Sequence, residues 1–146
     1  MQIHERYKPT VVLEGHLGGV LDVDVSADGR RALTCGRDGT VRLWDLQTNV
    51  QLDVLRGHHG PVQSVIFTAD DTYACSAGRD GDIRLWDLEN DQQVNRMHHG
   101  GWVYALCPGP DGRMLYAGGE DDTITCWDLH SRKQTARLVG HDGRIT

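Results

Sequence analysis

Residues 36–46 have the sequence GRDGTVRLWDL, and residues 78–88 repeat it as GRDGDIRLWDL, 42 positions further along the chain. A third version, GEDDTITCWDL at residues 119–129, follows after another 41 positions. A catalytic site needs its residues only once, whereas a nearly constant period of about 40 residues indicates one structural unit copied along the chain. The sequence therefore predicts an array of similar units.

Alignment on the Trp-Asp pair divides the chain into three complete units and a partial one. The units span residues 15–56, 57–97 and 98–139, and the partial unit spans residues 140–146. The stretch KPTVVLE at residues 8–14 matches the tails of the later units. We therefore expect a short N-terminal tail at residues 1–7 and a repeat segment over residues 8–146 that begins with the outer strand of a preceding unit.

Each unit contains four short strand patterns joined by turn-forming sequences such as SADGR and GPDGR. No stretch shows a convincing helical period, so the predicted class is all-β. Apolar residues at positions 20, 23 and 25 skip one step of the alternation, which predicts a β-bulge where the first strand begins. The predicted strands are residues 20–25, 31–35, 40–44 and 51–55; 62–67, 72–77, 82–86 and 93–97; and 103–107, 114–118, 123–127 and 134–139.

The order of GH, an apolar strand, DG and WD within each unit resembles the WD-repeat β-propellers. The resemblance covers about residues 8–146. It implies four-stranded antiparallel blades arranged radially, with each sequence repeat offset from the blade. About three blades are encoded, which is too few for a closed ring in one chain, because propellers typically use about 4 to 8 blades.

The resemblance also implies a buried hydrogen-bonded set of His, Ser or Thr, Asp and Trp in each blade. Ala117 stands where the third unit should supply its hydroxyl, so we expect one missing link and a third blade weakened by about 1–3 kcal/mol. The residues that the resemblance assigns to these sets are His16, Thr34, Asp38 and Trp44; His58, Ser76, Asp80 and Trp86; and His99, Asp121 and Trp127.

The same residue types occur in hydrolase triads, but here they recur in every unit, and the hydroxyl is expected between His and Trp. The pairs His58-His59 and His98-His99 have no partners at metal-ligand spacing. No phosphate-binding glycine loop is present in the sequence. The sequence therefore predicts no enzymatic activity, no metal and no cofactor.

Six residues are candidates for partner binding, because loops on a rigid propeller commonly carry function. Two neighbouring arginines would form a basic rim suited to a carboxylate or phosphate on a peptide, or they are simply solvated. Trp102 is either an exposed contact anchor or a filler between blades. The candidates are Arg37, Arg79 and Glu120 ahead of the structural Asp, and Gly19, Pro61 and Trp102 ahead of the first strand.

The composition narrows the class of partner. A net charge of -6 disfavours nonspecific binding to nucleic acid or to an anionic membrane. No apolar run of membrane-spanning length and no signal peptide is visible, so a cytoplasmic location is expected. The four cysteines fall within predicted strands without metal spacing, and we expect Cys35, Cys75, Cys107 and Cys126 to be buried thiols.

The sequence predicts a non-catalytic scaffold that binds a protein or an acidic peptide. One alternative is the regulatory or sensor propeller of a larger multidomain enzyme. Another is a propeller closed by oligomerisation, for example two copies that give six blades. GHDGRIT at residues 140–146 breaks off where a further first strand should begin. We therefore expect a piece of a longer protein rather than a self-associating unit.

Overall fold

A computed structural model describes residues 10–146 of the chain. The predicted N-terminal tail at residues 1–7, together with Lys8 and Pro9, lies outside the described residues. Across residues 10–146 the chain forms twelve strands and no helix, so the predicted all-β class is confirmed. The strands are β1 (Val20–Val25), β2 (Arg31–Gly36), β3 (Thr40–Asp45), β4 (Val50–Arg56), β5 (Val62–Phe67), β6 (Tyr73–Gly78), β7 (Asp82–Asp87), β8 (Gln92–His98), β9 (Val103–Pro108), β10 (Met114–Gly119), β11 (Thr123–Asp128) and β12 (Lys133–Val139).

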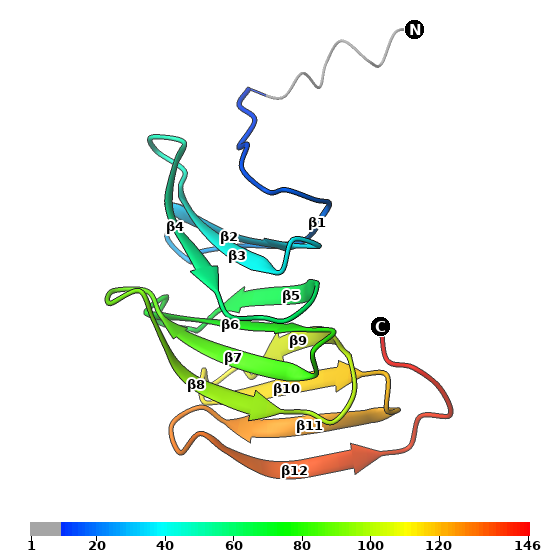
Figure 1. Ribbon diagram of the computed structural model, residues 1–146. Helices are drawn as coiled ribbons and strands as arrows, with labels where there is room; N and C mark the ends of the chain where they lie inside the picture. The colour runs from blue at the N-terminus through cyan, green and yellow to red at the C-terminus, as the bar shows by residue number, and fades with distance from the viewer. Residues whose placement is uncertain (1–9) are drawn as a thin grey trace, which may run out of the picture.

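The strands form three four-stranded antiparallel sheets, each a meander of consecutive strands: β1–β4, β5–β8 and β9–β12. We call these sheets blades 1, 2 and 3. Figure 1 shows the blades stacked on one another without closing into a ring. The predicted architecture of about three open blades is therefore confirmed, and the predicted strands agree with the observed ones to within one or two residues.

The first strand of each blade contains the predicted irregularity. The β1–β2 register shifts between Val20 and Asp22, and the β5–β6 register shifts between Val62 and Ser64. The β9–β10 ladder shifts at the equivalent place. Each bulge lies at the edge where the chain enters a blade, where a bulge bends the strand and increases its twist.

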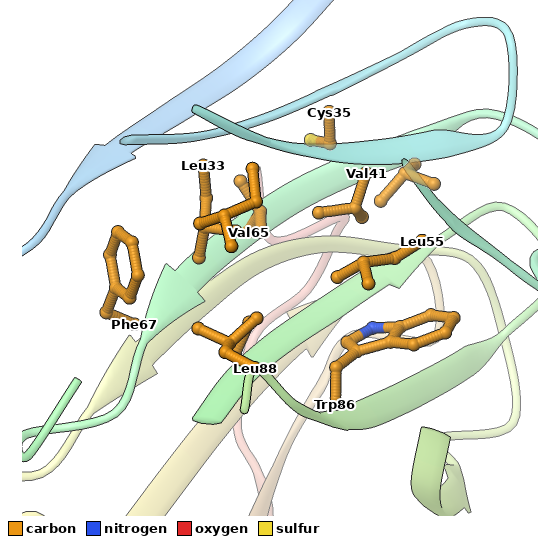
Figure 2. Packing of buried hydrophobic residues seen from close by; sticks show 11 residues of the cluster. Leu33, Cys35, Val41, Leu55, Val65, Phe67, Trp86 and Leu88 are labelled. Atoms are coloured by element: carbon orange, nitrogen blue, oxygen red, sulfur yellow. The ribbon is translucent and has the colours of Figure 1, made fainter. Parts of the chain in front are cut away.

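Two apolar clusters lie between the blades, and each joins one face of a blade to the facing side of the next. In the cluster shown in Figure 2, Leu33, Val41 and Leu55 of blade 1 pack against Val65 and Trp86 of blade 2. Blades 2 and 3 repeat this arrangement around Trp127. Each Trp-Asp tryptophan of blades 2 and 3 therefore packs against the preceding blade as well as its own.

The segments before β1 and after β12 are irregular. Residues 10–19 form no strand, so the expectation of an outer strand at the start is wrong. An outer strand must pair with the inner strands of its own sheet, and residues 10–146 contain no sheet that precedes blade 1. At the other end, the Ile145 N–H donates to the Gly119 carbonyl oxygen at 3.0 Å.

Cys35, Cys75 and Cys126 are buried, as expected, but Cys107 is exposed. Cys107 aligns with Ile66 of blade 2, which is buried in the cluster between blades 2 and 3. Across residues 10–146 no further blade packs on this side of blade 3. The prediction of a buried Cys107 is wrong for that reason.

Candidate functional site

Buried hydrogen-bonded sets hold blades 1 and 2. In blade 1, His16 Nδ1 lies 2.9 Å from an Asp38 carboxylate oxygen, and His16 Nε2 lies 2.8 Å from Thr34 Oγ1. The Trp44 indole N–H donates to the same hydroxyl oxygen at 2.8 Å. This arrangement is consistent with an imidazole that donates from Nδ1 and accepts at Nε2, so that both ring nitrogens of His16 and the Trp44 indole N–H have partners.

Blade 2 repeats this geometry. His58 lies 2.8 Å from Asp80 through Nδ1 and 2.8 Å from Ser76 Oγ through Nε2, and Trp86 donates to Ser76 Oγ at 2.8 Å. Burial acts to raise the pKa of Asp80, but the hydrogen bond from His58 and the backbone N–H of His59 outweigh it and lower that pKa to about 2. The Asp80 carboxylate therefore stays ionised at neutral pH.

Blade 3 differs from the sequence prediction of a missing hydroxyl at Ala117. No hydroxyl is missing, because Thr125 of β11 supplies it: Thr125 Oγ1 lies 2.7 Å from His99 Nδ1 and accepts from the Trp127 indole N–H at 2.8 Å. The His99 ring is turned over relative to His16 and His58, so that its Nε2 faces Asp121 at 2.9 Å. The prediction of a missing hydroxyl link in blade 3 is therefore wrong.

Blade 3 also differs from blades 1 and 2 in the arginine that lies next to the structural Asp. In blades 1 and 2 the position of Thr125 holds Arg42 and Arg84, whose guanidinium groups lie 3.7 and 3.8 Å from the carboxylates of Asp38 and Asp80. Blade 3 lacks that arginine, and Arg137 of β12 contacts the Asp121 carboxylate instead. Sequence reasoning missed both Thr125 and Arg137.

The set in blade 2 does not present a nucleophile to solvent. The Ser76 residue is 0 % exposed, and its hydroxyl oxygen already contacts both the imidazole and the indole. A hydrolase needs its hydroxyl open to the substrate and next to an oxyanion-stabilising group. The arrangement suits holding strands together rather than attacking a carbonyl group.

The six candidate binding residues occur as three equivalent pairs on one edge of the blades. In each pair, the residue ahead of the structural Asp donates its backbone N–H to the carbonyl oxygen of the residue ahead of the first strand. The pairs are Arg37 with Gly19 at 2.9 Å, Arg79 with Pro61 at 3.0 Å, and Glu120 with Trp102 at 2.8 Å. We call these six residues the rim.

One contact on the rim joins two blades. The Arg79 guanidinium of blade 2 lies 4.8 Å from the centroid of the Trp102 ring at the entrance to blade 3, a cation–π geometry. Trp102 also meets Tyr104 edge to face at 6.4 Å. Trp102 remains 38 % exposed, so it packs between neighbours and still offers a face to solvent.

The other rim side chains are also accessible. Arg37 and Arg79 are exposed, and neither has a carboxylate within 4.0 Å in the part of the chain that the structure describes. Glu120 pairs with Arg144 at 3.5 Å. Arg144 aligns with Gly19, Pro61 and Trp102, so the rim contact is again between one unit and the next.

In residues 10–146, no group of three His, Cys, Asp or Glu side chains could hold a metal ion. Over the same residues, no helix is long and apolar enough to cross a membrane.

The repeated four-stranded sheets, their facing apolar clusters and their His–Asp and Trp-centred bonds define blades of a β-propeller. The family model described as "WD domain, G-beta repeat" matches residues 7–45, 49–87 and 91–128. The chain belongs to the WD40 family.

Curated relatives share this repeat. The nuclear distribution protein nudF of Emericella nidulans is 34% identical over 134 residues, which are 91% of this chain and 21% of that protein. The nuclear distribution protein PAC1 of Candida dubliniensis is 42% identical over 53 residues, which are 32% of this chain and 11% of that protein. The chain thus spans only a small part of the curated relatives it matches.

A solved structure supports the same fold. The structure described as "Structure of U3-55K" superposes with a TM-score of 0.88 at 21% identity, and the match covers 92% of this chain and 43% of that one. Identity this low is evidence of the shared fold only.

Proposed function

We propose that this chain is a non-catalytic interaction scaffold that binds an acidic segment of a partner protein along the rim. The observation that carries the proposal is Arg79 stacked on the half-exposed ring of Trp102. A guanidinium held on an aromatic face keeps its N–H donors directed outward, and it can bind a carboxylate in bidentate fashion. Trp and Arg are also the residues that most often dominate binding energy at protein interfaces.

The location of the rim supports the proposal. The backbone of the rim residues is held by hydrogen bonds of 2.8 to 3.0 Å at the edge of the sheets. Little backbone ordering is therefore needed when a partner binds. Arg37 and Arg79 occupy equivalent positions in adjacent blades. This arrangement suits an extended segment that carries one carboxylate opposite each arginine. We further propose that the chain acts in the cytoplasm, a reducing compartment that suits its four free cysteines.

Trp102 gives this proposal a direct test. The other three tryptophans, Trp44, Trp86 and Trp127, are 3 %, 2 % and 6 % exposed, so a ligand at the rim should change the emission of Trp102 alone. A synthetic peptide of alternating Glu and Gly should shift this emission saturably, and the shift should weaken as salt screens the charges.

The matched control is the same titration with alternating Lys and Gly, which should have no effect. Arg79→Ala should weaken binding of the acidic peptide, and Trp102→Phe should remove the fluorescence change. A response that is identical for both peptides, or unaffected by Arg79→Ala, would overturn the proposal.

A second candidate function is a propeller closed by association of two copies. It is favoured by the exposed β1 side chains Val20, Val23 and Val25, which are 55 %, 59 % and 49 % exposed. They align with Val62, Val65 and Phe67, which are only 0 %, 1 % and 5 % exposed where blade 2 packs on blade 1.

The outer face of blade 3 is also exposed and apolar, at the position where blade 1 packs against blade 2. Leu138, which is 52 % exposed, aligns with Leu55, which is 3 % exposed beneath blade 2. Blade 3 of one copy can therefore receive blade 1 of another in the way that blade 1 receives blade 2. Such head-to-tail contacts close into a ring when the rotation permits.

A further inference from the structure

A cleft of about 770 Å³ separates blades 2 and 3 on the edge opposite the rim. In a meander, successive turns alternate between two edges, and the cleft is lined by the β5–β6, β9–β10 and β11–β12 turns. Its apolar lining includes Ala69, Tyr73 and Leu85 of blade 2 and Leu129 of blade 3. This site is separate from the surface in the proposed function.

The equivalent seam between blades 1 and 2 is bridged by side chains. The Arg31 guanidinium donates to the backbone oxygen of Asp71 at 2.7 Å and lies 5.6 Å from the centroid of the Phe67 ring. The Ala27 N–H donates to the Asp71 carboxylate at 2.8 Å. Three side chains from two blades therefore tie this seam together.

The seam between blades 2 and 3 has none of these bridging residues. Tyr73 stands at the position of Arg31, Pro108 at that of Phe67, and Gly112 at that of Asp71. Glycine offers no carboxylate and proline no aromatic face. The cleft therefore results from three local differences in sequence between otherwise equivalent units.

The two ends of the cleft differ in charge. At the inner end, the hydrogen bond from Thr68 lowers the pKa of Asp70, and the backbone N–H of Arg113 lowers that of Asp111, so both stay ionised. The outer β11–β12 turn contributes the exposed His130 and Arg132, and one guanidinium N–H of Arg132 donates to the Val94 carbonyl oxygen of blade 2 at 3.3 Å.

The remaining cation in the lining is already paired. Arg113 contacts the Asp128 carboxylate at 2.7 and 2.9 Å, so it adds little net charge to the cleft. The lining is thus negative toward the inner turns, apolar in the middle and positive toward the outer turn.

We propose that this cleft binds an extended peptide segment in which an apolar side chain lies between a basic and an acidic residue. The apolar side chain would pack on Tyr73, Leu85 and Leu129. The basic residue would face Asp70 and Asp111, and the acidic residue would face Arg132. Alternate residues of an extended peptide point to the same side, so the three recognised side chains are two positions apart.

The test uses the whole 146-residue chain labelled with ¹⁵N and the peptide acetyl-Lys-Ser-Leu-Ser-Asp-amide. Amide signals of residues 68–73, 111–113 and 129–132 should shift saturably, while those of Arg37 and Trp102 should not. Replacing the peptide's Asp by Lys should weaken binding about fivefold or more, as expected for loss of an exposed charge pair.

Two variants sharpen the test. The double substitution Tyr73→Arg/Pro108→Phe restores two of the three bridging residues of the seam between blades 1 and 2, fills the cleft with their side chains and should abolish the shifts. Arg37→Ala, on the opposite edge, should leave them unchanged. If the double variant fails to fold, Arg132→Gln should still weaken the Asp-ended peptide about fivefold, while it should not weaken the Lys-ended peptide, whose terminal charge the arginine repels.

The proposal fails if no shifts occur in the three turns up to about 10 mM peptide, which is beyond the range of weak specific binding. It also fails if the shifts are confined to the rim, or if the folded double variant binds like the unmodified chain.

Discussion

Ala117 and Thr125 are directly opposed in the antiparallel ladder of β10 and β11, and Thr125 carries the hydroxyl that Ala117 lacks. Opposed residues project to the same face of a sheet with their Cβ atoms about 5 Å apart, so the hydroxyl stays close to the same place. Thr125 in turn opposes Arg137 of β12. In blade 1 the corresponding row is Thr34 and Arg42, so the hydroxyl and the guanidinium have both moved one strand outward.

Thr125→Val should destabilise the chain by about 1–3 kcal/mol, because it keeps the shape of the side chain but leaves the His99 and Trp127 polar atoms without a partner. Urea unfolding followed by tryptophan fluorescence measures this change in the free energy of unfolding.

The informative control is Ala117→Ser. If the third blade lacked a hydroxyl, this substitution would stabilise it. The structure already places one hydroxyl between His99 and Trp127, and the 0 % exposed site of Ala117 is apolar, so we expect no gain in stability. A clear gain would contradict the position of Thr125.

The sequence was sufficient to predict the strands and the bulge, because these depend on local periodicity repeated three times, and the resemblance to WD-repeat propellers implied the blade pattern. It was not sufficient for Thr125, because the hydroxyl was expected on β10, where Thr34 and Ser76 stand in the other units. The available clue was a paired exchange: Ala117 loses a hydroxyl where Thr125 departs from Arg42 and Arg84.

Contacts between units were the other part that the sequence did not reveal. Arg79 and Trp102 were both singled out, but their stacking depends on how far blade 3 rotates relative to blade 2. The exposure of Cys107 likewise depends on the absence of a packed neighbour within residues 10–146.

Trp44→Ala should lower the free energy of unfolding by about 3–5 kcal/mol, as truncating a large buried aromatic side chain commonly does. Trp44 is 3 % exposed and donates to Thr34. Arg37→Ala, on the exposed rim, should leave the melting temperature nearly unchanged. Thermal unfolding followed by circular dichroism compares the two, and equal destabilisation would show that core and surface are wrongly assigned.

Acid should destabilise the fold through Asp80. Its pKa is lowered in the folded chain to about 2, so it contributes stability above the unfolded pKa of about 4. This contribution is lost as the pH falls from about 4 toward 2, because the unfolded state then binds the proton more readily. Asp80→Asn should reduce the slope of stability against pH in this window, as measured by urea unfolding at several pH values.

Asp91→Asn is the matched control. The nearby charge of Asp53 raises the pKa of Asp91, so ionisation of Asp91 opposes folding rather than favouring it. Its substitution should relieve destabilisation as the pH rises through its titration, the opposite sign to Asp80→Asn. If the two substitutions changed the slope in the same direction relative to the unmodified chain, the assigned environments would be contradicted.

Arg79→Ala should uncover the Trp102 ring with little loss of stability, since exposed cation–π contacts contribute only about 0.5–1 kcal/mol. Acrylamide, a neutral quencher, should then reduce the fluorescence more strongly than in the unmodified chain. Arg37→Ala should leave quenching unchanged, because it is the Arg79 guanidinium that lies over the Trp102 ring. Equal quenching in all three proteins would mean that Arg79 does not cover Trp102 in solution.

The exposed faces of blades 1 and 3 should make this chain associate in solution. Val23 is 59 % exposed, whereas Val65 at the same position of blade 2 is 1 % exposed, and apolar surface of this kind is normally covered. Light scattering on a sizing column should therefore give a mass above the monomer's 16.2 kDa. Val23→Lys should return the chain to the monomer, because a charge cannot be buried cheaply between two apolar sheets. A sharp dimer would support closure by two copies. A monomer in both proteins would instead contradict association and leave further blades of a longer chain as the expected neighbours.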